Sequence, residues 1–152
     1  MKVLHLICTD VFSGAENVAC QIINGFQNDK NFQMVYCSPS GPNETSLAER
    51  KVKHLKLNKF DYKSTKKAIE EFEPDIIHAH DIKASVMASL ICGKKIKIIS
   101  HVHSNHENMR KVNIKTLMFN YCSKNFSKII WVSQSAFDNY IFKDKVKEKS
   151  II

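Results

Sequence analysis

Arginine is almost absent from this sequence of 152 residues. The formal net charge of +8 comes from 23 basic and 15 acidic residues, and the only arginines are Arg50 and Arg110. Proteins that read the phosphates or bases of nucleic acids usually rely on the planar fork of arginine, so a charge made of lysine argues against that class of partner. Solvated lysine faces explain most of this charge. The alternative is attraction to an anionic membrane surface or to a phosphate-bearing substrate.

Long apolar runs and paired cysteines are also missing. No segment approaches the roughly 18 apolar residues of a spanning helix, and the apolar run at the amino end is too short for a signal peptide. The five cysteines lie at positions 8, 20, 37, 92 and 122 in apolar surroundings, without a C-x-x-C pair. They indicate small core residues in a reducing compartment, not a disulfide or zinc framework. We therefore expect a soluble, cytoplasmic protein.

Apolar segments of strand length alternate with amphipathic segments of helix length. The expected strands cover residues 3–8, 32–37, 54–57, 75–79, 97–102 and 128–132, with a further strand starting at the end of the chain. The expected helices cover residues 18–26, 45–51, 64–72, 83–91, 114–122 and 135–142. This alternation predicts a single Rossmann-like α/β domain, a doubly wound parallel sheet with helices on both faces. In the usual strand order 3-2-1-4-5-6, ligands bind beyond the carboxyl ends of strands one and four.

The loop after the first expected strand lacks the G-x-G-x-x-G fingerprint, which disfavours a standard NAD or FAD site. Shortly after Asp10 the chain instead contains Ser13-Gly14-Ala15-Glu16, which matches the S-x-x-E capping box of a helix start. Capping alone explains Ser13 and Glu16. A functional interpretation is compatible with it, because Gly14 has no side chain to block a ligand and a helix start offers free N–H groups to a phosphate.

Histidines gather where the fourth and fifth strands end. His78 and His80 form one H-x-H pair, and His101 and His103 form another. Such pairs point both imidazoles to one face of a strand, as a metal site would require. The second pair resembles the H-x-H-x-D-H signature of metallo-β-lactamase-like hydrolases, but Asn105 replaces the aspartate. Two other interpretations stay open: His78 and His101 are core residues, or one histidine per loop meets a substrate and titrates near neutrality.

Five segments together resemble family 4 glycosyltransferases of the GT-B fold, most of all bacterial enzymes that build capsular or other surface polysaccharides. The segments are residues 2–6, 13–16, 74–80, 101–104 and 131–135, and they occur in the family's order. The resemblance implies that residues 1–152 are the N-terminal, acceptor-side domain. It also implies that the C-terminal domain, which holds the nucleotide diphospho-sugar, is absent, so that the chain alone is inactive.

The resemblance also implies roles for individual residues. His103 corresponds to the histidine that contacts the transferred sugar, and we treat it as the catalytic candidate. Ser13 and Gly14 correspond to the turn near the donor phosphates. The other expected substrate-binding residues are Asp10, His80, Asp81 and Ser104. The expected reaction transfers sugar with retention and needs no metal or other cofactor, since helix N-termini and hydrogen-bond donors can stabilise the departing diphosphate.

A lipid-linked glycan is the expected acceptor. Lys111, Lys115, Lys124 and Lys128 lie close in sequence to Met109, Phe119 and Phe126, which suggests peripheral contact with the inner leaflet of the cell membrane. A solvated helix face is the alternative. The rival functions are a non-catalytic Rossmann-like binding module and a metal-dependent hydrolase that uses the histidines.

Overall fold

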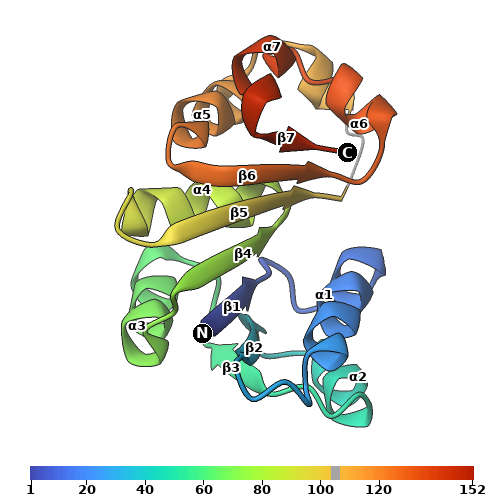
Figure 1. Ribbon diagram of the computed structural model, residues 1–152, viewed down its shortest axis with the longest axis vertical. Coiled ribbons are helices and arrows are strands. Elements are labelled where there is room, and N and C mark those ends of the chain that lie inside the picture. Colours follow the sequence, from blue (N-terminus) through green and yellow to red (C-terminus); the bar gives the residue numbers. More distant parts are fainter. Residues whose placement is uncertain (104–106) are drawn as a thin grey trace.

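The computed structural model describes residues 1–103 and 107–152, and its centre is a parallel sheet of seven strands in the order β3-β2-β1-β4-β5-β6-β7 (Figure 1). The strands are β1 (Lys2–Leu6), β2 (Gln33–Pro39), β3 (His54–Leu57), β4 (Ile76–His80), β5 (Lys97–Val102), β6 (Phe126–Trp131) and β7 (Ser150–Ile151). The order confirms the predicted 3-2-1-4-5-6 arrangement and adds the expected strand at the end of the chain as its last member. Winding therefore reverses between β1 and β4.

Helices cover both faces of the sheet, as predicted (Figure 1). They are α1 (Gly14–Gly25), α2 (Asn43–Glu49), α3 (Tyr62–Phe72), α4 (Asp81–Cys92), α5 (Ile114–Ser123), α6 (Gln134–Asp138) and α7 (Lys143–Val146), with short 3₁₀ turns η1 (Glu107–Arg110) and η2 (Lys147–Lys149). Buried residues of α3, α4 and α5 share one hydrophobic cluster, and those of α1 and α2 form a second. Figure 1 shows the two groups on opposite sides of the sheet.

The helix expected over residues 135–142 ends early, because α6 stops at Asp138 and the next helix, α7, begins only at Lys143. Between them Tyr140 turns inward, with 1% of its surface exposed. Its ring packs 5.5 Å from those of both Phe119 and Trp131. The break after Asp138 lets the side chain of Tyr140 enter the core, which a helix continued to residue 142 would not allow. Burial of this large aromatic side chain outweighs the local helix pattern.

Strand alternation assigns each central side chain to one face of the sheet. Leu4, Leu6, Ile77 and Ala79 belong to the cluster beneath α3, α4 and α5. The residues between them have the opposite orientation and face the side of α1. On the two central strands these intervening residues are His5 and His78, which are paired in register. The apolar core on one face thus fixes histidines on the other.

Candidate functional site

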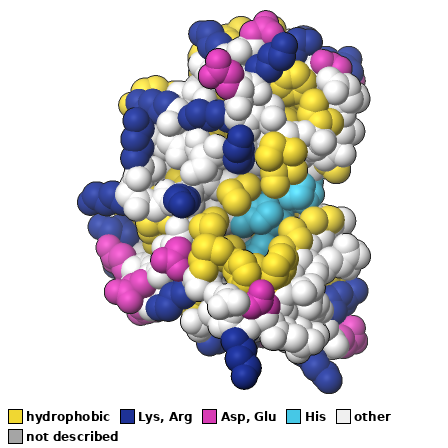
Figure 2. Space-filling view, viewed as in Figure 1, with side chains coloured by type: hydrophobic (Ala, Val, Ile, Leu, Met, Phe, Trp, Pro, Cys, Tyr) yellow, Lys and Arg dark blue, Asp and Glu magenta, His cyan; other side chains and the backbone are white. Residues whose placement is uncertain are grey.

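The tips of β1, β4 and β5 lie at the switch point of the sheet, where α1 leaves on one face and α4 on the other. This is the place where doubly wound proteins bind ligands. Figure 2 shows histidine side chains at the bottom of a hollow on this side of the molecule, bordered by hydrophobic side chains. The site is built from the start of α1, the start of α4 and the end of β5.

Glu16 organises the start of α1. Its carboxylate accepts hydrogen bonds from the backbone N–H of Ser13 (3.0 Å), the hydroxyl of Ser13 (2.6 Å) and the hydroxyl of Thr9 (2.8 Å). The predicted capping box is present. Burial acts to raise the pKa of Glu16, but the hydrogen bonds from Ser13 and Thr9 hold this pKa below its ordinary value. A negative charge is therefore fixed inside the first turn of α1.

Gly14 and Ser13 are exposed at this helix start. A Cβ added at Gly14 would meet no heavy atom of the described residues within 4 Å, so the space beside it is open. Asp10 is exposed on the preceding loop, and its carbonyl accepts a hydrogen bond from the N–H of Asn43 (2.9 Å). Gly41 allows this approach, because a Cβ there would come within 2.7 Å of the Asp10 side chain.

Five histidines from three adjacent strands form one continuous cluster on the α1 side of the sheet. The members are His5, His78, His80, His101 and His103. The ring centroids of His78 and His80 are 4.5 Å apart, and those of His101 and His103 are 3.9 Å apart. The register joins the two pairs, because His80 lies opposite His101. The two H-x-H pairs therefore point to the same face, as the spacing predicts.

Burial keeps the histidine cluster uncharged at neutral pH. His5, His78 and His80 are 0%, 7% and 2% exposed. Desolvation lowers the pKa of His5 to about 4, that of His78 to about 2, and that of His80 well below its ordinary value. The half-buried His101 and His103 also have lowered pKa values, about 4 in the case of His101. The neutral imidazole form of His103 therefore predominates at neutral pH.

A hydrogen-bonded chain runs through the cluster from His5 to His103. His80 Nε2 lies 3.1 Å from His5 Nδ1, and His80 Nδ1 lies 2.9 Å from His103 Nε2. A neutral imidazole has one N–H, so His80 donates to one neighbour and accepts from the other. His5 Nε2 is buried and has no partner among the described residues.

The unpartnered nitrogen of His5 sets the direction of this chain. A buried N–H without a partner costs more than an unused lone pair, which favours the hydrogen of His5 on Nδ1. His5 then donates to His80, and His80 donates to Nε2 of His103. His103 is left with its hydrogen on Nδ1, as a neutral donor of fixed orientation.

Two carboxylates act on His103 from the neighbouring helix starts. Burial dominates and lowers the pKa of His103, while Asp81 and Glu16 act to raise it. Asp81 follows His80 directly and has a φ of 73°, in the left-handed region that costs a non-glycine residue roughly 1–2 kcal/mol. The starts of α1 and α4 and the end of β5 thus meet at one rim, as expected. Ser104 lies outside the described residues.

The sequence did not reveal the part played by His5. It stands in the apolar segment 2–6, where the resemblance assigned it no role, yet its partner in register is His78. The signal was its position, because it alternates with Leu4 and Leu6 and must face away from them. Cys8 was expected to be a core residue. It is only half-buried, and Lys83, Asp81 and Glu16 all act on its thiol, whose pKa burial raises.

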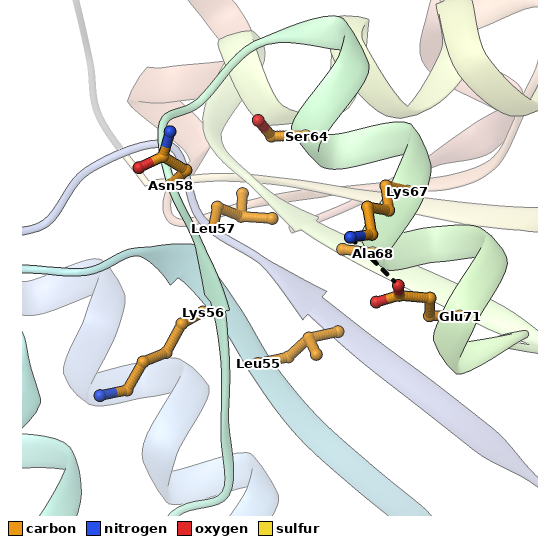
Figure 3. A pocket seen from close by; sticks show the side chains of 8 residues that line it. All are labelled: Leu55, Lys56, Leu57, Asn58, Ser64, Lys67, Ala68 and Glu71. Atoms are coloured by element: carbon orange, nitrogen blue, oxygen red, sulfur yellow. Dashed lines mark ion pairs between the residues drawn. The ribbon is translucent and has the colours of Figure 1, made fainter.

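Two cavities that lie away from this rim contain none of the predicted site residues. Figure 3 shows one of about 250 Å³ between β3 and α3, lined by residues that include Leu55, Leu57 and Ser64. Two of its three charged residues, Lys67 and Glu71, form an ion pair across one helical turn (3.6 Å). A second, mainly apolar groove of about 360 Å³ lies between α4 and α5.

Solved structures with the same architecture include a glycosyltransferase and several UDP-GlcNAc 2-epimerases. A glycosyltransferase from Rickettsia africae matches with a TM-score of 0.72 and 15% identity over 99% of this chain and 41% of its own. UDP-GlcNAc 2-epimerase from Neisseria meningitidis, bound to UDP-GlcNAc, matches with a TM-score of 0.65 and 17% identity over 100% of this chain and 45% of its own. The UDP-GlcNAc 2-epimerase from Methanocaldococcus jannaschii matches with a TM-score of 0.61 and 13% identity over 99% of this chain and 44% of its own. These likenesses establish the fold, one half of a GT-B architecture, and the chain spans less than half the length of each.

The family is shown by a separate comparison. No curated protein matches the chain significantly. The model of Glycosyltransferase Family 4 matches residues 12–151, a stretch that includes the α1 start, both H-x-H pairs and β6. The chain belongs to Glycosyltransferase Family 4.

Proposed function

We propose that this chain is the acceptor-side half of a retaining glycosyltransferase, which moves a sugar from a nucleotide diphospho-sugar to a glycan acceptor in surface polysaccharide synthesis. The observation that carries the proposal is the position of His103. It lies at the end of β5, hydrogen-bonded to His80, on the rim where α1 and α4 begin. The family supports the reaction class, and the rim supplies groups suited to it.

In this proposal His103 donates a hydrogen bond to the transferred sugar. A neutral imidazole suits that role, because it can donate a hydrogen bond to the sugar. A charged imidazolium would instead be attracted to the diphosphate and away from the sugar. His80 is too deeply buried to make broad contact with a substrate, and it orients His103 instead. The exposed residues Ser13 and Gly14 would lie beside the donor phosphates, because a helix start attracts negative charge, although the N–H of Ser13 itself is bonded to Glu16. No bound metal or other cofactor is needed for these contacts.

Asp10, Asp81 and Ser104 belong to the acceptor side in this proposal. Asp81 begins α4 in a strained left-handed conformation, and such strain gathers at functional sites. Asp10 is exposed on the loop before α1. Carboxylates at these positions can accept hydrogen bonds from sugar hydroxyls and thereby hold the acceptor against the anomeric carbon.

Replacing Gly14 by alanine separates stability from binding. We expect the free energy of unfolding to change by less than about 1 kcal/mol, since the added Cβ meets open space and alanine favours a helix. The affinity of the complete protein for a nucleotide diphospho-sugar should fall roughly tenfold or more, because the Cβ occupies the approach to the N–H groups. Calorimetric titration measures this. Gly25→Ala is the matched control at the other end of α1, where a Cβ also meets nothing. Equal affinities for both variants would remove Gly14 from the donor site.

A lipid-linked acceptor is the further part of the proposal, and it requires an approach to a membrane. Within the described residues, no helix has the length and apolar character to cross a bilayer. The expectation that Met109, Phe119 and Phe126 lie near the membrane is wrong. Their side chains are 2%, 0% and 2% exposed, because they fill the core. The exposed apolar residues of this region are different ones. Ile114 and Tyr121 on α5 are 80% and 61% exposed.

These residues make α5 a candidate for peripheral contact. Ile114, Leu117 and Tyr121 are spaced to lie on one side of the helix. Lysines flank them: Lys111 and Lys124 are exposed, and the ammonium of Lys124 lies 3.7 Å from the ring centroid of Tyr121. An apolar stripe with basic neighbours is suited to the surface of an anionic leaflet.

Co-sedimentation with vesicles tests the membrane contact. We expect the wild-type chain to bind vesicles containing anionic lipid more than neutral vesicles. The double change Ile114→Ser and Leu117→Ser should reduce binding about 30-fold, since each exposed apolar side chain contributes roughly 1 kcal/mol. A variant with Val11→Ser and Tyr62→Ser, which removes exposed apolar residues far from α5, serves as the control. Binding that does not respond to anionic lipid would contradict the contact.

The two rival functions make different predictions. A metal-dependent hydrolase would lose activity in a chelator, and the doubly wound parallel sheet does not correspond to the metallo-β-lactamase-like pattern that suggested it. A non-catalytic module would bind sugar ligands, but the complete protein would transfer nothing. Assaying sugar transfer by the complete protein, with and without chelator, distinguishes all three.

A further inference from the structure

The histidine cluster contains a set of nitrogens suited to a metal ion. His80, His101 and His103 each offer one ring nitrogen, and these three atoms lie within 4.8 Å of one another. The set arises from the strand register, which places His80 beside His101, and from the H-x-H spacing that adds His103 on the same face. The two adjacent strands β4 and β5, with the residue that directly follows β5, thus supply all three ligands.

The nitrogens already lie close to the spacing that a shared ion needs. His80 Nδ1 and His103 Nε2 are 2.9 Å apart and share one proton. Two nitrogens on a tetrahedral zinc, each at about 2.0–2.1 Å, lie roughly 3.3 Å apart. An ion can therefore take this place with a small movement of the rings, when the hydrogen of His80 moves to its Nε2 and that of His5 to its own Nε2, so that every imidazole stays neutral. His101 Nδ1 is buried without a hydrogen-bond partner among the described residues, so this ring is not held by a bond through that atom.

The surroundings favour a cation and let it enter. The carboxylates of Glu16 and Asp81 act electrostatically on His103 and offset part of the charge of an ion. His101 and His103 are partly exposed, so solvent reaches the set and can fill a fourth position. A second set, formed by His5, His78 and His80, has ligand atoms at similar spacing but is wholly buried. Of these two sets, the first combines three ligands with access.

We propose that His80, His101 and His103 form a binding site for a divalent transition-metal ion of the zinc type. Imidazole nitrogen suits zinc, cobalt, nickel and copper and does not suit magnesium or calcium, which prefer oxygen. The ion is not part of the transfer reaction. It engages Nε2 of His103 and leaves the Nδ1–H of that ring for the sugar contact, which, unlike the metal binding, rests on the proposed function.

Binding of zinc to the 152-residue chain, without any sugar, tests the site. We expect zinc to bind in competition with a chromophoric chelator, and cobalt to give the intense visible absorption of a four-coordinate ion. His101→Ala and His103→Ala should each weaken binding at least tenfold, since each removes one of three ligands. His54→Ala, which changes a histidine of β3 outside the cluster, should leave the affinity unchanged.

Two further variants keep the test decisive. His78→Ala belongs only to the buried set, so a larger effect from it than from His103→Ala would overturn the assignment. Asp81→Asn should weaken zinc binding several-fold while all three ligands remain. Circular dichroism and thermal melting confirm that each variant is folded. Failure of the wild-type chain to bind zinc at millimolar concentration would also overturn the proposal, whereas failure of sugar transfer would not affect it.

Discussion

Replacing His103 by alanine should lower kcat of the complete transferase by about 10²- to 10³-fold, with a much smaller change in KM. Removal of one preorganised donor near the reacting atoms typically has an effect of this size. The structure explains why the donor is preorganised: His103 Nε2 lies 2.9 Å from His80, which is itself 3.1 Å from His5. Water admitted by the smaller side chain would not reproduce that fixed direction. Steady-state assays with a nucleotide diphospho-sugar measure both constants.

The control for His103 is another histidine with similar burial. His54 on β3 is half-buried and lies 3.0 Å from the Ser38 hydroxyl, away from the rim. His54→Ala should retain near-normal turnover. His80→Asn should reduce kcat less than His103→Ala does, because it removes the orientation and keeps the donor. Normal turnover of the His103→Ala enzyme would remove this residue from the reaction.

Acid should unfold the domain steeply between pH 6.5 and about 5. The unfolded chain binds protons on its histidines below the ordinary pKa of 6.5, whereas burial lowers the pKa of His5 to about 4 and that of His78 to about 2. His80 is lowered well below its ordinary value for the same reason. The stability that comes from keeping these rings neutral is complete above pH 6.5. It is lost as the pH falls, since the unfolded state binds more protons.

The expected loss is large for a domain of this size. Each buried histidine costs about 1.4 kcal/mol per pH unit in this range, so His5, His78 and His80 together remove about 4 kcal/mol by pH 5.5. The free energy of unfolding of a typical domain is only about 5–15 kcal/mol. Urea unfolding of the chain from pH 7.5 to 5.5, with a chelator present, measures it. His101, His103, Glu16 and Asp81 also face the cluster and modify the slope.

A variant identifies the groups responsible for the acid sensitivity. His78→Phe removes one buried imidazole and should lower the slope of stability against pH by about one proton. His54→Phe should change the slope less, because His54 is only half-buried, although burial lowers its pKa as well. Stability that stays constant down to pH 5.5 would contradict the buried, neutral cluster.

Periodicity alone predicted most of the fold. The strands expected over residues 54–57 and 97–102, for example, have the predicted bounds in the structure. The break between α6 and α7 was not predicted, since it depends on Tyr140 reaching Phe119 and Trp131 from distant elements. Such a contact has no local signature in the sequence.

The sequence predicted only those site residues that lie at the ends of expected strands. Sequence indicated Gly14, His80 and His103 because each lies at or beyond the end of a strand of the central sheet. It could not show that His80 is 2% exposed and supports His103, nor that His5 completes the cluster. Those facts depend on the register between strands that are far apart in the chain, which His5 and His78 share. The hydrophobic residues near the α5 lysines were misjudged for the same reason.

Histidine ring resonances, followed while a nucleotide diphospho-sugar is added to the complete protein, test the central idea most directly. The rim at β1, β4 and β5 predicts saturable shifts of the His103 ring and of the Gly14 amide, with His54 unmoved. Shifts confined to residues of the β3–α3 cavity, such as Ser64, with His103 and Gly14 unaffected, would contradict the proposed site.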